Sequence, residues 1–416
     1  MTGWRSRISR RGLLVGAVAA GTATGAVLPG VTSGSQRGER FSPVADRVAF
    51  HGLVQAGVTN PAPPHASVIA FDVTAVNQAE LGELLRELTE RARLLCAGDY
   101  EPAVRDITGT PADSGVLGPQ PPPDRLTVTL GVGASLFDQR YGLASRQPPG
   151  LRPMRTFPND SLQPERCHGD LSLQICANSR DTVIHALRDL TRHTRGGMQV
   201  RWRVDGFLSP PRPSGTPRNL MGFKDGTANP NVTDPALMDR LVWVDREQGL
   251  PGQLWTAGGS FQVIRRIRML VEFWDRVSVS EQENMFGRRR DTGAPLDGSV
   301  EFDIPRYDLD PTGTSIPLTS HIRRANPRTE STAESIPLRR PYNYDAGVDG
   351  VGNLDMGLLF ICYQRDLAAQ FEAVQIRLIN EPLVDYIEPN GGGYFFVLPG
   401  IRGATDYWGR TLLGRA

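Results

Sequence analysis

The sequence predicts an α+β fold in which helices cover one face of antiparallel sheets. In several short segments apolar residues alternate with polar ones, as in half-buried strands, and in others they recur every three or four residues, as in amphipathic helices. A strand-helix unit also recurs weakly along the chain. Ile-Cys at 175–176 lies shortly before Arg-Asp at 180–181 and a predicted helix, and Ile-Cys at 361–362 lies shortly before Arg-Asp at 365–366 and another helix.

The strands are predicted from short apolar runs that turn-forming residues separate. Residues 126–132 are an example, because Leu126, Val128, Leu130 and Val132 alternate with smaller or polar residues and predict a strand with one buried face. The predicted strands are residues 68–73, 126–132, 171–176, 200–204, 263–274, 358–363 and 394–398.

Helices are predicted where apolar residues share one face at helical spacing. The Pro-rich segment 101–124 and the charged run 288–291 predict loops, the second of them solvated. The residues predicted to face inward from the three helices are Leu81, Leu84, Leu85 and Leu88; Val183, Leu187 and Leu190; and Leu367, Phe371, Val374 and Leu378.

Composition sets the broad class of protein. At 416 residues the chain is long enough for two domains with sizeable cores. A formal net charge of +1 gives no electrostatic reason to expect a nucleic-acid partner. Of the four cysteines, Cys176 and Cys362 lie in predicted strands, where a small buried thiol is a simpler interpretation than a disulfide.

The N-terminus has the form of an export signal. Residues 9–14 read Ser-Arg-Arg-Gly-Leu-Leu, a twin-arginine pattern, and an apolar run continues to Leu28. This run is shorter than the roughly 20 apolar residues of a membrane-spanning helix, so we expect a signal peptide and no stable membrane insertion. Residues 30–45 resemble a flexible linker, which places residues 1–45 outside the fold. Export by the twin-arginine machinery would deliver the protein to the periplasm, the cell envelope or the extracellular space.

Two segments about 100 residues apart carry the candidate chemistry. Residues 222–230 place Asp225 in a Gly-Phe-Lys-Asp-Gly-Thr-Ala-Asn-Pro stretch, where glycines allow close approach to a flat ligand. Residues 321–344 combine His321, an Asn-Pro turn and several arginines. An imidazole and guanidinium groups suit haem, which needs an axial iron ligand and partners for its propionates. Each segment alone also fits an ordinary turn or a basic surface loop.

Together, in this order, the segments resemble the dye-decolourising peroxidase family, particularly its twin-arginine-exported deferrochelatase/peroxidase members. The matching stretches are Gly-Phe-Lys-Asp-Gly-Thr at 222–227, Ser-His-Ile-Arg at 320–323 with Asn-Pro-Arg at 326–328, and Leu-Arg-Arg at 338–340 followed by Tyr342. The resemblance covers roughly residues 45–412. It implies two ferredoxin-like domains of the dimeric α+β barrel type, at 46–210 and 211–416, with haem in the second.

The resemblance also implies a role for each site residue. His321 would be the axial iron ligand, with its second nitrogen bonded to a carboxylate that the sequence does not identify. Asp225 and Arg339 would be the catalytic pair on the opposite face of the haem, and which of the two dominates is left open. The residues that would line the macrocycle, its edge or a propionate are Gly226, Thr227, Ala228, Asn326, Pro327, Arg328 and Arg339.

The implied function is that of a haem b peroxidase with one haem per chain. Hydrogen peroxide would oxidise dyes or phenolics through an oxo-ferryl intermediate, and an aspartate base predicts an acidic pH optimum. Aromatic residues that could be exposed and relay electrons from a bulky reductant are Trp202, Tyr342, Tyr344 and Tyr394, although core packing is the stronger interpretation for Trp202 and Tyr394. Two alternatives stay open: a deferrochelatase that releases iron from haem and leaves the porphyrin intact, and a non-catalytic haem carrier. Whether the chain forms a homo-oligomer is also open.

Overall fold

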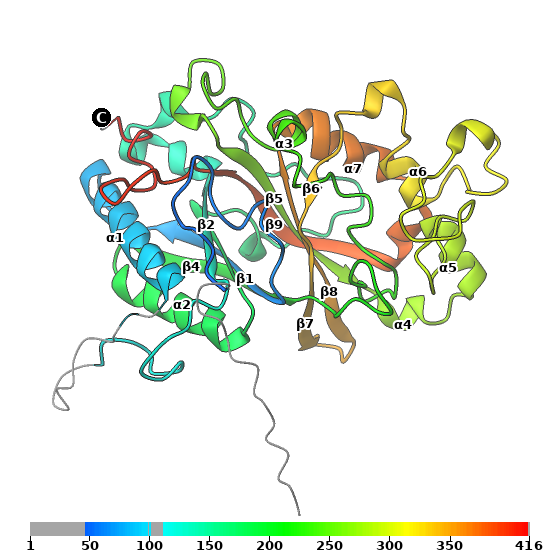
Figure 1. Cartoon of the computed structure of the whole chain (residues 1–416), viewed down its shortest axis with the longest axis horizontal. Coiled ribbons are helices and arrows are strands. Elements are labelled where there is room, and N and C mark those ends of the chain that lie inside the picture. The colour runs from blue at the N-terminus through cyan, green and yellow to red at the C-terminus, as the bar shows by residue number, and fades with distance from the viewer. Residues whose placement is uncertain (1–45, 99, 101–110, 415–416) are drawn as a thin grey trace, which may run out of the picture. The chain divides into compact units, whose positions relative to one another are not determined.

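The computed structural model describes residues 46–98, 100 and 111–414. The first half of this part follows the order strand, helix, strand, strand, helix, strand (Figure 1). Within the antiparallel sheet the strand order is β4-β1-β3-β2, which is the ferredoxin-like arrangement. The elements are β1 (His65–Val73), α1 (Gln78–Ala97), β2 (Thr127–Gly133), β3 (Leu171–Ala177), α2 (Arg180–His193) and β4 (Met198–Phe207).

The second half repeats this arrangement, with strand order β9-β5-β8-β7. The two-residue strand β6 pairs with β8 beside β7. Helix α3 (Pro235–Leu241) precedes this unit, and a π-helical turn at Leu367–Glu372 leads into α7. The elements are β5 (Ser260–Met269), α4 (Val271–Trp274), α5 (Val279–Phe286), α6 (His321–Ala325), β6 (Leu338–Arg339), β7 (Tyr342–Val348), β8 (Leu354–Gln364), α7 (Ala373–Leu378) and β9 (Ile387–Val397).

The two sheets join at both edges and close into an antiparallel barrel. Strand β2 pairs with β9 over three residue pairs, and β4 pairs with β7 at Phe207 and Asn343. Because β5 also pairs with β8, the strand order β5-β9-β2-β3-β1-β4-β7-β8 returns to its start. The predicted α+β class with duplicated ferredoxin-like halves is therefore confirmed.

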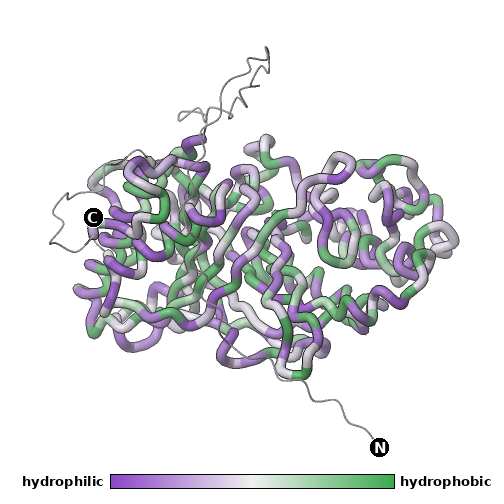
Figure 2. The backbone as a smooth tube through the Cα atoms, turned by 90° about the horizontal axis from the view of Figure 1, so that it is seen from below, coloured by the Kyte–Doolittle hydropathy of each residue, from purple (hydrophilic) through white to green (hydrophobic). Residues whose placement is uncertain are grey.

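The two N-terminal helices form as their sequence patterns predict. Helix α1 begins after Asn77, whose side chain accepts a hydrogen bond from the backbone N–H of Glu80 and so satisfies one of the free donors of the first turn. The predicted inward residues of both helices are buried, and the two helices lie side by side (Figure 1). In Figure 2 hydrophobic residues, in green, recur along the strands and helices, while many residues of the outer loops are hydrophilic, in purple.

The expectation that residues 126–132 form a half-buried strand is wrong. All seven residues of β2 are buried, because one face packs under the helices and the other faces the barrel interior. Polar side chains there bond to one another: Tyr363 donates to Gln174 over 2.7 Å and accepts from Gln262 over 3.0 Å. In this barrel, polar residues that alternate with apolar ones along a strand therefore face the barrel interior and not solvent.

Other predicted boundaries change slightly. The strand expected over 263–274 ends at Met269, and a short helix buries Trp274 after it. Cys176 and Cys362 are buried free thiols in β3 and β8, as expected. The twin-arginine stretch at 9–14 lies outside the described residues. Within the part that the structure describes, no helix is long and apolar enough to cross a membrane.

Candidate functional site

His321 is the first residue of α6 and is held by a carboxylate from a distant segment. Its Nδ1 lies 2.7 Å from Oε2 of Glu381, which follows α7 and is only 3% exposed. The Nε2 atom makes no hydrogen bond to any described residue, so it is free to bind a ligand. Burial alone would lower the pKa of His321, but the charge and hydrogen bond of Glu381 outweigh it and the pKa is raised above 6.5. Sequence reasoning expected such a carboxylate but could not identify one 60 positions away.

Asp225 and Arg339 form an ion pair close to His321. Nη1 of Arg339 lies 2.8 Å from Oδ1 of Asp225. The Arg339 charge lowers the pKa of His321 and the Asp225 charge raises it, so all three groups share one electrostatic environment. The structure thus brings together the three residues that the sequence singled out.

The backbone around this pair is fixed by residues that sequence reasoning missed. The Asn229 side-chain amide donates to the Arg339 carbonyl over 2.7 Å and accepts from the Arg339 N–H over 3.1 Å. The Asp225 N–H donates to the Pro217 carbonyl over 2.9 Å. Asn229 follows Asp225 by four positions in a turn-like sequence, and no local signal points to its partner 110 residues later.

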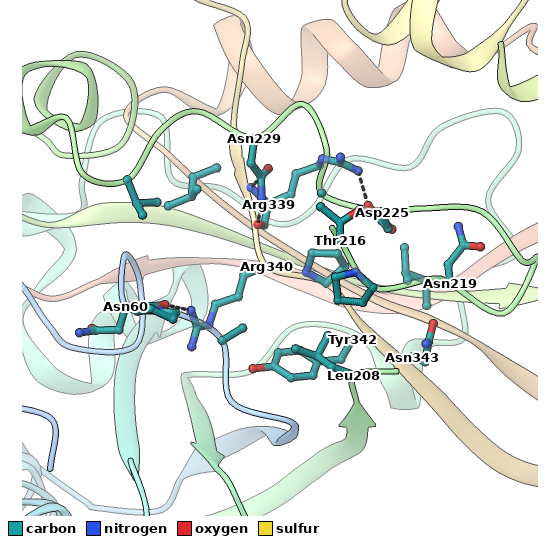
Figure 3. A pocket seen from close by; sticks show the side chains of 18 of the residues that line it. Asn60, Leu208, Thr216, Asn219, Asp225, Asn229, Arg339, Arg340, Tyr342 and Asn343 are labelled. Carbon is teal, nitrogen blue, oxygen red and sulfur yellow. Dashed lines mark hydrogen bonds and ion pairs between the residues drawn. The ribbon is translucent and has the colours of Figure 1, made fainter. Parts of the chain in front are cut away.

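Arg339 and Arg340 are neighbours that point in opposite directions (Figure 3). Arg339 extends to Asp225, whereas Arg340 is 5% exposed and Nη1 donates to the carbonyl of Asn60. The Nε and Nη2 atoms of Arg340 are buried without a partner among the described residues. Successive residues of an extended chain face opposite sides, so only Arg339 reaches Asp225.

Arg288 corrects the expectation of a solvated loop at 288–291. Its side chain is buried, at 6% exposed, and Nη1 donates to the carbonyls of Gly293 and Glu301 over 2.6 and 2.9 Å. Burial lowers its pKa, and the charges of Arg328 and Arg339 lower it further, while Tyr307 and Glu301 offset only part of this effect. No carboxylate within the described ranges forms an ion pair with Arg288. A buried cation without a counter-ion is costly, so this cluster of arginines fits an anionic group such as a haem propionate.

The remaining predicted residues lie around the same region. Asn326 ends α6, and its Oδ1 accepts a hydrogen bond from the Arg328 N–H over 3.2 Å, while Arg328 itself is exposed. Thr227 donates to Glu301 over 3.1 Å, and Ala228 is exposed. Gly226 has a φ of 96° and Pro327 is half-buried.

A pocket of about 240 Å³ reaches Asp225 and Arg339 (Figure 3). Residues of both barrel halves line it, because it lies near the edge where β4 meets β7. Tyr342 lines the pocket but is fully buried, and Tyr344 is buried as well, so the expectation that these tyrosines are exposed is wrong. The residues from the two halves include Val58, Asn60, Leu208, Asp225, Asn229 and Tyr342.

Comparison with known proteins identifies similar chains. The family model described as "Dyp-type peroxidase, N-terminal" matches residues 55–208, and that described as "Dyp-type peroxidase, C-terminal" matches residues 216–402. A deferrochelatase of Escherichia coli O157:H7 is 51% identical over 379 residues, which covers 90% of this chain and 89% of that protein. The deferrochelatase of Escherichia coli strain K12 is 50% identical over 389 residues, which covers 92% of this chain and 90% of that protein.

Solved structures agree in fold. The crystal structure of a DyP-type peroxidase from Cellulomonas bogoriensis matches with a TM-score of 0.77 and 38% identity, covering 88% of this chain and 98% of that one. Ferric DtpA from Streptomyces lividans matches with a TM-score of 0.78 and 35% identity, covering 88% and 97%.

Proposed function

We propose, from the premise that this chain belongs to the Dyp-type peroxidase family, that it is a haem b enzyme that uses hydrogen peroxide to oxidise organic molecules such as dyes and phenolics. The observation that carries the proposal is the arrangement of His321, Asp225 and Arg339. An imidazole with one free nitrogen shares its electrostatic environment with a paired carboxylate and guanidinium. Each of these groups has a distinct use in peroxide chemistry.

The residues present fit one haem per chain, held within residues 211–416. His321 would bind the iron through Nε2, because Nδ1 is occupied by Glu381. Arg288 and Arg328 would face the propionates, whose negative charge would add to that of Glu301 near the buried Arg288. When bound, haem supplies the iron that takes two electrons from an organic donor for each peroxide reduced. Glu381 keeps the imidazole oriented and strongly basic.

Asp225 and Arg339 would divide the work of breaking the O–O bond. Hydrogen peroxide must lose a proton from one oxygen and gain one on the other, and the Asp225 carboxylate can carry that proton between them. The Arg339 guanidinium can stabilise the negative charge that develops on the departing oxygen. The pocket beside the pair gives a small molecule a route to both groups.

The test compares variants of this pair in the haem-loaded protein. Asp225→Asn and Arg339→Leu are each expected to lower kcat/KM for peroxide in dye oxidation by about 10²- to 10⁴-fold, the usual effect of losing acid-base or electrostatic catalysis. Asp349→Asn is the matched control, because it breaks the similarly exposed ion pair with Arg268 away from the site. Unchanged rates in both site variants would reject the catalytic role.

A second function, release of iron from haem with the porphyrin left intact, is favoured by the names of the relatives that are about 50% identical. Incubation of the protein with haem and extraction of the pigment distinguishes the two. Free protoporphyrin, detected by fluorescence and absent in His321→Ala, would support iron release. A non-catalytic carrier would give neither protoporphyrin nor dye oxidation, and it would have no use for the Asp225–Arg339 pair.

Export by the twin-arginine route is part of this proposal. It is supported by the Ser-Arg-Arg-Gly-Leu-Leu stretch at 9–14 and the apolar run after it. Replacement of Arg10 and Arg11 by lysine is expected to leave the protein in the cytoplasm, which fractionation followed by immunoblotting would detect.

A further inference from the structure

Glu301 joins the two ends of the loop that carries Asp225. It lies in a loop between α5 and α6, and its side chain is nearly buried, at 8% exposed. One oxygen, Oε1, accepts three hydrogen bonds: from the Thr216 N–H at 3.0 Å, from the Thr216 hydroxyl at 2.6 Å and from the Thr227 hydroxyl at 3.1 Å. The other oxygen, Oε2, lies 3.3 Å from Nζ of Lys224. One carboxylate therefore contacts three residues of a single loop.

These contacts enclose Asp225 on both sides. Lys224 precedes Asp225 directly and Thr227 follows it by two residues, and Glu301 contacts both. Lys224 also donates to the Thr216 carbonyl over 3.1 Å, and the Asp225 N–H donates to the Pro217 carbonyl. The backbone of Asp225 is thus fixed by a network whose centre is Glu301.

Two glycines leave the space that this network needs. A Cβ at Gly215 would lie 1.9 Å from Oε2 of Glu301, and a Cβ at Gly293 would lie 2.6 Å from Cγ of Lys224. Both glycines have positive φ angles, of 77° each. A residue larger than glycine at either position would displace Glu301 or Lys224. Glycine at both positions therefore leaves room for the ion pair between Glu301 and Lys224.

Glu301 also connects the Asp225 loop with the buried cation Arg288. The Glu301 carbonyl accepts a hydrogen bond from Nη1 of Arg288 over 2.9 Å. Burial would raise the pKa of Glu301, but the hydrogen bonds from Thr216 and the interaction with Lys224 outweigh it and lower the pKa, which keeps the side chain ionised near neutral pH. The backbone of Glu301 therefore contacts Arg288, while its side chain contacts the loop that carries Asp225.

We propose that Glu301 is a positioning residue that fixes the Asp225 carboxylate for proton transfer, an inference that rests on the proposed role of Asp225. Glu301 touches neither Asp225 nor its partner Arg339 through any described hydrogen bond or ion pair, so it acts through Thr216, Lys224 and Thr227. A displacement of about 1 Å at a catalytic group can reduce a rate about 100-fold. A carboxylate that fixes this loop therefore controls the peroxide step without taking part in it.

The experiment uses the full haem-loaded chain with Glu301→Ala and Glu301→Gln. Glu301→Ala is expected to lower kcat/KM for peroxide by about 10- to 100-fold, while KM for the dye and the visible spectrum of the haem stay unchanged. Glu301→Gln keeps the oxygen that accepts from Thr216 and Thr227, so its loss should be smaller. Asp349→Asn, which breaks the Arg268 ion pair elsewhere, should leave kcat/KM for peroxide unchanged.

A second measurement does not depend on the cofactor. In the haem-free protein, hydrogen exchange at the N–H groups of Thr216 and Asp225 should be faster in Glu301→Ala than in the wild type. The Thr216 N–H loses its acceptor, and the Asp225 N–H lies in a loop that is no longer fixed. If Glu301→Ala does not fold, kcat/KM for peroxide and exchange at the Asp225 N–H in Glu301→Gln decide, because this variant keeps the acceptor of the Thr216 N–H but loses the ion pair with Lys224. Normal kcat/KM for peroxide, or normal exchange at both N–H groups, would overturn the proposal.

The two proposals can fail separately. If Asp225→Asn keeps full activity, the proposed function of Asp225 fails whatever Glu301 does. If Asp225→Asn is inactive and the Glu301 variants keep the wild-type rate, only the positioning role fails.

Discussion

At the scale of single residues, the contact between His321 and Glu381 links haem binding to pH. Because Glu381 raises the pKa of His321 above 6.5, their pairing stabilises the haem-free protein fully below about pH 6.5, and this contribution is lost as the pH rises through the raised pKa. Iron binds the neutral imidazole, so a proton must leave when haem binds. We therefore expect the haem affinity of the haem-free protein to increase as the pH rises through this range.

The variant Glu381→Gln tests this linkage. Loss of the carboxylate charge should lower the pKa of His321 and move the midpoint of the affinity-pH curve to lower pH. Loss of the strong hydrogen bond should weaken haem binding at pH 8 by about 10- to 100-fold. Absorbance titrations with haem at a series of pH values measure both effects. A midpoint that does not move would show that Glu381 does not control the protonation of His321.

The sequence could predict the residues of the site that lie within short motifs. His321, Asp225 and Arg339 each stand in a distinctive local stretch, and the structure places all three together. Glu381 could not be predicted, because its contact with His321 spans 60 residues and depends on how α6 and α7 pack. Arg288 could not be distinguished from its neighbours in the run 288–291, since burial of one arginine among three is decided by the fold.

At the scale of elements, α6 is too short to hold His321 by itself. It has five residues, and helices of this length gain their stability from tertiary contacts. Arg377 in α7 supplies them, because Nε donates to the Arg324 carbonyl over 3.1 Å and Nη2 donates to the Ala325 carbonyl over 3.0 Å. These two carbonyls belong to the C-terminal end of α6, where free acceptors need partners.

The variant Arg377→Met should therefore loosen the helix that carries His321. We expect a loss of about 1 to 3 kcal/mol in the free energy of unfolding, because two hydrogen bonds from a charged donor disappear. We also expect faster transfer of haem to an acceptor protein, measured by absorbance. Arg365→Met, at an exposed position after β8, is the control. Equal haem transfer rates in the two variants would contradict the role of Arg377.

At the scale of the whole described molecule, the barrel makes the two halves depend on each other. Separate family models match residues 55–208 and 216–402, but the strands of the two halves pair at both edges. Each half alone would expose two sheet edges, which invite aggregation. We expect the intact protein to unfold in one calorimetric transition.

A split chain tests this dependence. Cutting within the exposed segment 210–215 leaves each set of strands intact. Either fragment expressed alone should be insoluble, and co-expression of both should restore a soluble complex that binds haem. A soluble, cooperatively unfolding C-terminal fragment would show that the halves are independent domains. Solubility, calorimetry and the visible spectrum provide the measurements.

The sequence predicted the strands and helices of this barrel better than their burial. Apolar positions of α1 and α2 were placed correctly, because one helical face packs on the sheet and the other meets solvent. The polar positions of β2 were misassigned, because the barrel interior holds hydrogen-bonded polar side chains such as Gln174 and Tyr363. Closure of the sheet decides this environment, and it is not encoded in any single strand.

The opposite directions of Arg339 and Arg340 limit how the chain can change during evolution. If β6 shifted by one residue after the loss of a residue before it, Arg340 would take the place of Arg339 beside Asp225, and Pro341 would take the place of Arg340 near Asn60. Composition would be almost unaltered, yet the interior near Asn60 would lose its guanidinium. Indels in the stretch leading to Leu338 should thus be tolerated only where the intervening loop absorbs them, so that Arg339 and Arg340 keep their partners.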